Sequence, residues 1–125
     1  MSEYGHTCTI RGDGGQTIRA VLDRIGNKWT LLIVATLDRG SMRFTDLHQQ
    51  VTGISQRMLT LTLRNLEADG LVSRTVYAEV PPRVEYALTA TGKSLIPPAL
   101  ALADWAIEHL PHIEASRAAY QNRSR

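Results

Sequence analysis

The chain has 125 residues, 43% of them hydrophobic, which suits one compact domain with its own core and argues against a disordered protein. The formal net charge is only +2 and is close to zero between Arg39 and Tyr86, so bulk charge indicates an anionic partner only weakly. A single cysteine, Cys8, excludes an internal disulfide, and no apolar run reaches the roughly 20 residues of a membrane span. Because the N-terminus also lacks the residue order of a signal peptide, we expect a cytoplasmic protein with no membrane partner.

The N-terminal part of the chain is predicted to be a flexible arm followed by one domain. Residues 1–15 include three closely spaced glycines and show no apolar period, so the arm is placed there and the single domain at 16–125. Apolar residues at helical spacing then predict a helix that Thr17 caps and that ends at Gly26. A second helix follows, and its predicted buried face consists of Trp29, Leu32, Ile33, Thr36 and Leu37.

The middle of the chain predicts a short edge strand and two helices. The strand is placed at 41–44, and Thr45 is predicted to cap the third helix. Gly53 then permits a sharp turn into a fourth helix, which Ser55 caps and Gly70 ends. The apolar face of this fourth helix consists of Leu59, Thr62, Leu63 and Leu66, and the opposite face of Gln56, Arg57, Thr60 and Arg64, while Leu61 fits the pattern least well.

A β-hairpin is predicted directly after the fourth helix. Two alternating runs, 72–77 and 83–88, flank a Pro-Pro pair that cannot complete a strand ladder and therefore belongs at the tip. Thr89 is predicted to cap the last long helix, which Pro97 and Pro98 kink or restart. Pro111 is predicted to begin a short final helix. Turn, helix and ribbon in succession predict a mainly α fold with a small hairpin wing, the winged helix-turn-helix.

The polar face of the fourth helix predicts contact with double-stranded DNA. Gln56, Arg57 and Thr60 lie in its first turns, the end that meets base edges when such a helix enters the major groove. Arginine can bond guanine and glutamine can bond adenine through two hydrogen bonds, each pair contributing about 1–3 kcal/mol of discrimination. Taken alone, the polar face of this helix could simply be solvated, as on any amphipathic helix. The turn before the helix and the ribbon after it favour the interpretation that this face contacts DNA.

Other polar residues around this helix are predicted to position the protein on the DNA backbone or to act through the wing. These residues are Arg43, Ser55, Arg64, Arg74 and Arg83. Of the two ribbon arginines, Arg83 beside the tip is favoured over Arg74, because a protruding ribbon tip reaches flanking phosphates or a minor groove. An exposed arginine on a hairpin with no ligand is the alternative for each of them.

Several long motifs appear in a fixed order between residues 17 and 109. They are VLDRIGNKW at 21–29, RFTDL at 43–47, GISQRMLT at 53–60, LRNLEADGLV at 63–72, VPPRVEYALT at 80–89, and Trp105. This series resembles the HxlR-type bacterial transcriptional regulators, which are winged helix-turn-helix proteins. The resemblance implies a homodimer that dimerises through its N- and C-terminal helices and represses or activates transcription at a palindrome-like operator. Half-site centres in such an operator lie roughly 10–10.5 base pairs apart, or a multiple of that.

The resemblance also bears on Cys8. Members of this family commonly carry a cysteine just ahead of the first helix, and in some it senses oxidants or electrophiles. That position is Gln16 here, and Cys8 lies eight residues earlier in the chain. We therefore expect an ordinary thiol, with a redox sensor or a bridge between protomers as the alternatives.

Other chemistries find little support in the sequence. Pro111 separates His109 from His112 and no third ligand is evident, so no metal and no cofactor are expected. No serine, histidine or aspartate has a recognisable nucleophile context, so we do not expect an enzyme. A small-molecule effector pocket between the helices and the dimer interface stays open, with its ligand unknown. The alternative function is a winged-helix protein-interaction module without DNA binding, which Leu61 and the near-zero local charge keep open.

Overall fold

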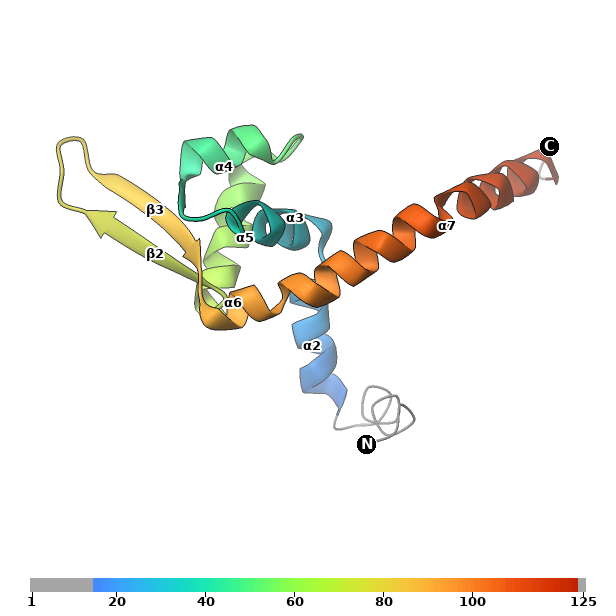
Figure 1. Cartoon of the computed structure of the whole chain (residues 1–125), viewed down its shortest axis with the longest axis horizontal. Coiled ribbons are helices and arrows are strands. Elements are labelled where there is room, and N and C mark those ends of the chain that lie inside the picture. The colour runs from blue at the N-terminus through green and yellow to red at the C-terminus, as the bar shows by residue number, and fades with distance from the viewer. Residues whose placement is uncertain (1–14, 124–125) are drawn as a thin grey trace.

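The computed structural model describes residues 15–123. The helices in that range are α2 (Gln16–Ile25), α3 (Lys28–Leu37), α4 (Phe44–Gln50), α5 (Gln56–Ala68), α6 (Ala90–Ser94) and α7 (Ile96–Arg123). The strands are β1 (Met42–Arg43), β2 (Val72–Tyr77) and β3 (Arg83–Leu88). The β2–β3 ribbon projects from one side of the helical body and α7 projects from the opposite side (Figure 1). The predicted arm at 1–15 falls almost wholly outside the described residues.

The three strands form one antiparallel sheet in the order β1-β3-β2. β2 pairs with β3 from Val72 opposite Leu88 to Tyr77 opposite Arg83, and β1 pairs with the other edge of β3. The predicted edge strand at 41–44 is therefore confirmed, although only Met42 and Arg43 pair with β3. The mainly helical fold with a small hairpin wing is confirmed as well.

The core lies where α3, α4 and α5 meet the base of the ribbon. It consists of Ile33, Val34, Leu37, Leu47, Val51, Ile54, Leu59, Leu63, Leu66, Leu71, Val72 and Leu88. α5 buries Leu59, Thr62, Leu63 and Leu66, as its spacing predicts. The predicted face of α3 is partly wrong, because Leu32 is exposed while Thr30 and Val34 are buried. α3 is apolar almost all round, so the spacing of its apolar residues does not indicate which face is buried.

Two of the predicted helix caps are confirmed. The Ser55 hydroxyl accepts a hydrogen bond from the backbone N–H of Met58 at 3.0 Å, and Thr89 accepts one from Gly92 at 3.1 Å. The helix that Thr89 caps is the short α6, and the long α7 begins separately at Ile96. Gly53 adopts φ +88°, a left-handed backbone that residues with a side chain rarely take, and this allows the turn between α4 and α5.

Two other predicted caps are wrong. α2 begins at Gln16 after Gly15, so Thr17 lies inside its first turn. α4 begins at Phe44 with Arg43 in the cap position, so Thr45 lies inside the helix. Arg43 is the last paired residue of β1 and is already extended, so the chain passes directly from strand into helix.

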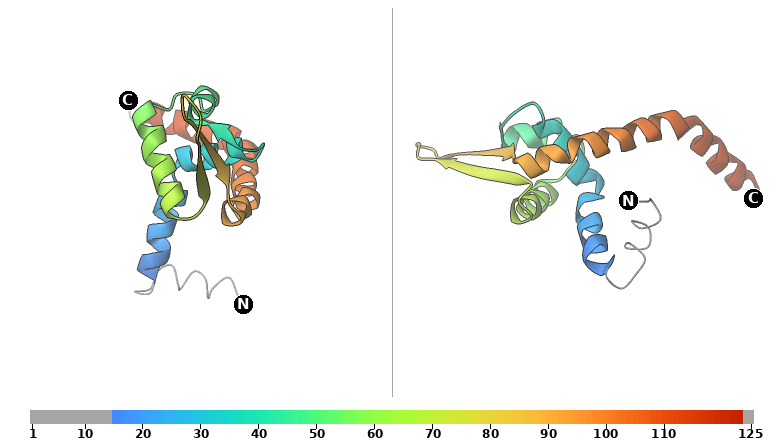
Figure 2. Two further views of the ribbon diagram at one scale, coloured as in Figure 1. Left: turned by 90° about the vertical axis from the view of Figure 1, so that its left-hand side faces the viewer. Right: turned by 60° about the horizontal axis from the view of Figure 1, so that its bottom comes forward.

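The prolines of the C-terminal region have different effects. α6 ends at Ser94 and α7 begins at Ile96, so the predicted restart near Pro97 and Pro98 is confirmed. The predicted new helix at Pro111 is wrong, because α7 continues through Pro111 to Arg123. No described side chain of α7 is buried, so water can reach the carbonyl that the proline leaves unbonded. The C-terminal part of the helix is bent relative to its first part, as the right-hand view of Figure 2 shows.

The Ser55 cap gives a testable consequence for stability. Ser55→Ala removes the acceptor for the Met58 N–H and is expected to lower the free energy of unfolding by about 1 kcal/mol. Urea denaturation of both proteins at one concentration measures the change. Ser55→Asp is the control, because its carboxylate can accept the same bond. If Ser55→Ala unfolds at the wild-type urea concentration, the cap contributes nothing.

Candidate nucleic-acid interface

The exposed face of α5 brings four of the predicted site residues together. Gln56, Arg57 and Arg64 are exposed and Thr60 is half-buried, while the opposite face of the helix is in the core. These four side chains line one open hollow together with Phe44 and Leu61. Ile54 and Leu59, on either side of the cap, are both buried, so the first turn of α5 is held firmly at its base.

Two apolar side chains belong to this face that were not predicted as site residues. Leu61 is 51% exposed and Phe44 is half-buried, and both line the same hollow as Arg57. The poor fit of Leu61 to the helical pattern was the one sequence signal of its position. Apolar side chains on such a face are suited to contact the methyl group of thymine.

Thr60 has less hydrogen-bonding capacity than its position suggests. Its hydroxyl donates to the backbone carbonyl of Gln56 at 2.8 Å, so its one proton is used within α5. What remains for a base is the methyl group and the free lone pair of the oxygen.

The wing approaches the later turns of α5. Arg74 lies opposite Tyr86 in the β2–β3 register, and both line a second hollow with Thr60, Arg64 and Glu67. Arg74 and Arg64 therefore border one concave surface between the helix and the ribbon. Glu67 in the same hollow partly offsets their charge.

Arg83 turns back across the ribbon near its tip. Its guanidinium lies 4.1 Å from the centre of the Tyr77 ring, and its Nη2 is 3.2 Å from Oε1 of Glu79. Its Nε is buried, and within residues 15–123 it has no hydrogen-bond partner. Arg43, the last residue of β1, is exposed.

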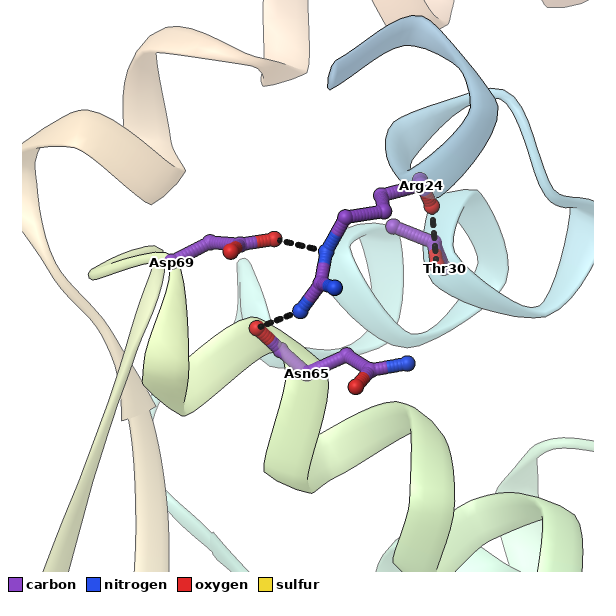
Figure 3. Close-up of polar contacts among 4 residues, drawn as sticks. All are labelled: Arg24, Thr30, Asn65 and Asp69. Carbon is purple, nitrogen blue, oxygen red and sulfur yellow. Dashed lines mark hydrogen bonds and ion pairs between the residues drawn. The ribbon is translucent and has the colours of Figure 1, made fainter. Parts of the chain in front are cut away.

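A polar cluster connects α2 to the far end of α5 (Figure 3). Arg24 donates from Nε to Oδ2 of Asp69 at 2.7 Å and from Nη2 to the carbonyl of Asn65 at 3.3 Å. Thr30 donates its hydroxyl to the carbonyl of Arg24 at 3.1 Å. Sequence reasoning missed this cluster, since no local pattern links residues 45 positions apart.

Comparison with known proteins identifies the family of this chain. A family model for the HxlR-like helix-turn-helix matches residues 24–114. The chain belongs to the HxlR-like helix-turn-helix family. An HTH-type transcriptional regulator of Methanothermobacter thermautotrophicus is 47% identical over 100 residues, which are 80% of this chain and 76% of that protein.

Solved structures of similar regulators agree with this assignment. The transcriptional regulator ytfH from Salmonella typhimurium is 40% identical, with a TM-score of 0.73 over 81% of this chain and 90% of that one. The redox regulator HypR in its reduced form is 41% identical, with a TM-score of 0.72 over 80% of this chain and 99% of that one.

The family membership decides between the functions that the sequence left open. The chain is a DNA-binding transcriptional regulator of the HxlR type, and the reading as an interaction module without DNA binding is not favoured. The family and the relatives are regulators rather than enzymes.

Within residues 15–123 no three histidine, cysteine or acidic side chains gather as metal ligands, and the His109 ring instead stacks on the Trp105 ring, with 4.6 Å between the ring centres. None of the described helices combines the length and apolar character needed to cross a bilayer. Cys8 lies outside the described residues.

Proposed function

We propose that this HxlR-type regulator acts in the cytoplasm as a homodimer on a palindrome-like operator. Gln56, Arg57 and Thr60 of each protomer read base edges in the major groove. The observation that carries this proposal is the two-sided character of α5, whose apolar face is buried while its polar face is open. A helix held in this way can enter a groove without giving up its place in the core.

The backbone contacts of the proposed complex come from residues around that helix. Ser55 lies at the start of α5, Arg64 lies two turns into it, and Arg43 is exposed ahead of α4. Arg74 on the wing borders the same hollow as Arg64, while Arg83 reaches DNA by leaving or sharing its pairing with Glu79. Positive side chains at four of these places, together with the Ser55 hydroxyl, fix the register of the protein on the duplex without reading sequence.

Exposed apolar side chains on the terminal helices support the homodimer. α2 exposes Ile18, Val21 and Leu22, and α7 exposes Leu100, Leu102, Trp105, Ile107 and Leu110. Apolar surface of this extent is usually covered by a partner, and a second copy is the partner that a two-fold operator requires. We therefore assign α2 and α7 to the dimer interface.

Selection of bound duplexes from a random DNA pool with the purified protein tests the proposal. The expected result is an inverted repeat whose half-site centres are separated by roughly 10–10.5 base pairs or a multiple of that. Recovery of a single unrepeated site would contradict the homodimeric mode. A pool that remains random would contradict specific DNA reading altogether.

The two ribbon arginines are expected to contribute differently to the salt dependence of DNA binding. Arg74→Ala should reduce the slope of log K against log salt by about one unit, because one phosphate contact is lost. Arg83→Ala should reduce it less, because Glu79 already offsets that charge. Titrations of one operator duplex at several salt concentrations measure both slopes. A larger change for Arg83→Ala would show that the Glu79 pair opens on DNA.

Whether the Cys8 thiol senses oxidants is tested by repeating the DNA selection in the presence of a mild oxidant. HypR is a redox regulator, and that similarity is the reason to compare wild type with Cys8→Ser here. We expect oxidation to leave the selected site and its affinity unchanged in both proteins, since Cys8 lies eight residues ahead of Gln16. Loss of binding in wild type alone would instead make Cys8 a sensor.

A further inference from the structure

α2 is attached to the rest of the protein by few contacts. None of its side chains is buried, and Ile25 at its end is the one described α2 residue packed partly against the core. Only Gly26 and Asn27 separate α2 from α3. A helix that has no buried side chain and a two-residue link to the next helix depends on polar bonds to keep its angle.

Arg24 supplies such bonds, and it supplies them to the recognition helix. Its side chain reaches both Asp69, the C-cap residue of α5, and the carbonyl of Asn65 in the last turn of α5, as Figure 3 shows. A cation suits this end of a helix because the carbonyls there carry partial negative charge, and the carbonyl of Asn65 accepts the Asp69 N–H at 3.0 Å as well. Thr30, which is 4% exposed, holds the main-chain carbonyl of Arg24 against α3. The end of α2 is thus fixed to α3 through its backbone and to α5 through its side chain.

We propose that Arg24 is a positioning residue that fixes the angle between α2 and α5 and thereby sets the half-site spacing that the homodimer accepts. The proposal rests on the proposed function, in which α2 contacts the second protomer and α5 enters the major groove. The distance and rotation between the two recognition helices then depend on how each α5 is oriented relative to its own α2. Arg24 touches no base and no phosphate in this arrangement, so it acts on spacing and not on half-site sequence.

The guanidinium is suited to this role in a way that other cations are not. Its planar fork presents several N–H groups in fixed directions, so one side chain bonds a carboxylate and a carbonyl at once. A lysine at this position can keep the ion pair with Asp69 but fixes no angle. Arg24→Lys should therefore behave more like Arg24→Ala than like wild type.

Operators with altered spacers test the proposal. Each added or removed base pair rotates one half-site by about 35° relative to the other, which a dimer with a fixed angle tolerates poorly. We expect Arg24→Ala to narrow the affinity gap between the preferred spacer and spacers one base pair longer or shorter by about two- to fivefold, which is the range for a half-exposed ion pair. Base preference within the half-site should stay as in wild type. An unchanged gap would overturn the proposal.

Two further proteins separate positioning from a general loss of structure. Asp23→Ala removes the neighbouring charge of α2 and should keep the wild-type spacer preference. The exchange Arg24→Asp with Asp69→Arg keeps an ion pair with the charges reversed but removes the bond to the Asn65 carbonyl, so it should be about as permissive as Arg24→Ala. Full wild-type spacer preference in the exchanged protein would overturn the claim that the two bonds of Arg24 fix the angle. Sedimentation and thermal unfolding of every variant confirm that the dimer is intact.

A distance measurement without DNA distinguishes failure of this proposal from failure of the proposed function. A spin label at Leu61→Cys in a Cys8→Ser background reports the separation of the two α5 helices in the free dimer, because Leu61 is exposed on α5. The distribution of distances should be narrow with Arg24 and broader with Arg24→Ala. Equal distributions overturn the positioning role even if the operator is found. A broadened distribution in a protein that selects no operator supports the positioning role and overturns the proposed function instead.

Discussion

Replacing Gln56 and Arg57 together with alanine is expected to abolish most of the preference of this regulator for its operator. Both side chains are exposed in the first turn of α5, next to the Ser55 cap. Two bidentate base contacts contribute about 2–6 kcal/mol of discrimination when both are present. The gap between operator and random-sequence DNA should shrink by that amount, while affinity for random DNA falls much less because Arg43, Arg64 and Arg74 remain.

Competition binding of operator and random duplexes at one salt concentration measures this gap. Alanine is a good helix former and neither side chain is in the core, so the variant should fold as well as wild type. Arg64→Ala serves as the matched control, since a phosphate contact weakens both duplexes alike. A double variant that keeps the full gap would remove α5 from base reading.

α5 and its turn could be predicted from sequence because every local signal there agrees. The Ser55 cap, the buried Ile54 and Leu59, and the spacing of the apolar face all favour the same helix in the same register. A left-handed glycine precedes the helix at Gly53 and another follows it at Gly70. The ribbon follows with no gap, so the chain order itself indicates the wing.

The predictions that proved wrong lie where local signals were weak or where tertiary structure overrode them. α3 is apolar almost all round, so its sequence could not show that Leu32 is exposed. Thr45 looked like a cap, but pairing of β1 with β3 determined where α4 begins. Pro111 looked like a helix start, but an exposed helix tolerates one missing hydrogen bond.

The candidate site likewise has features that the sequence could predict and features that it could not. Its α5 residues follow from helical geometry, so their common face could be predicted. The folded-back conformation of Arg83 could not, because it depends on Tyr77 across the ribbon and on Glu79 in the loop at the tip. The bonds from Arg24 to α5 could not either, because they depend on how two helices far apart in the chain pack together.

Leu59 and Leu61 provide a second test with a large expected effect, since they lie two residues apart on the same helix. Leu59 is 0% exposed within the core, whereas Leu61 is 51% exposed beside Arg57. Leu59→Ala should lower the free energy of unfolding by about 2–5 kcal/mol, because it removes buried contacts and leaves a cavity. Leu61→Ala should change it by less than about 0.5 kcal/mol.

Urea unfolding followed by tryptophan fluorescence measures both changes, at a single protein concentration because a dimer's stability depends on it. The DNA readout should show the opposite order. Leu61→Ala should alter affinity for the operator, since Leu61 shares the hollow of Gln56 and Arg57. Leu59→Ala, measured where it is still folded, should bind with nearly wild-type affinity. The reverse result, a destabilising Leu61→Ala and a harmless Leu59→Ala, would mean that α5 presents its other face to the core.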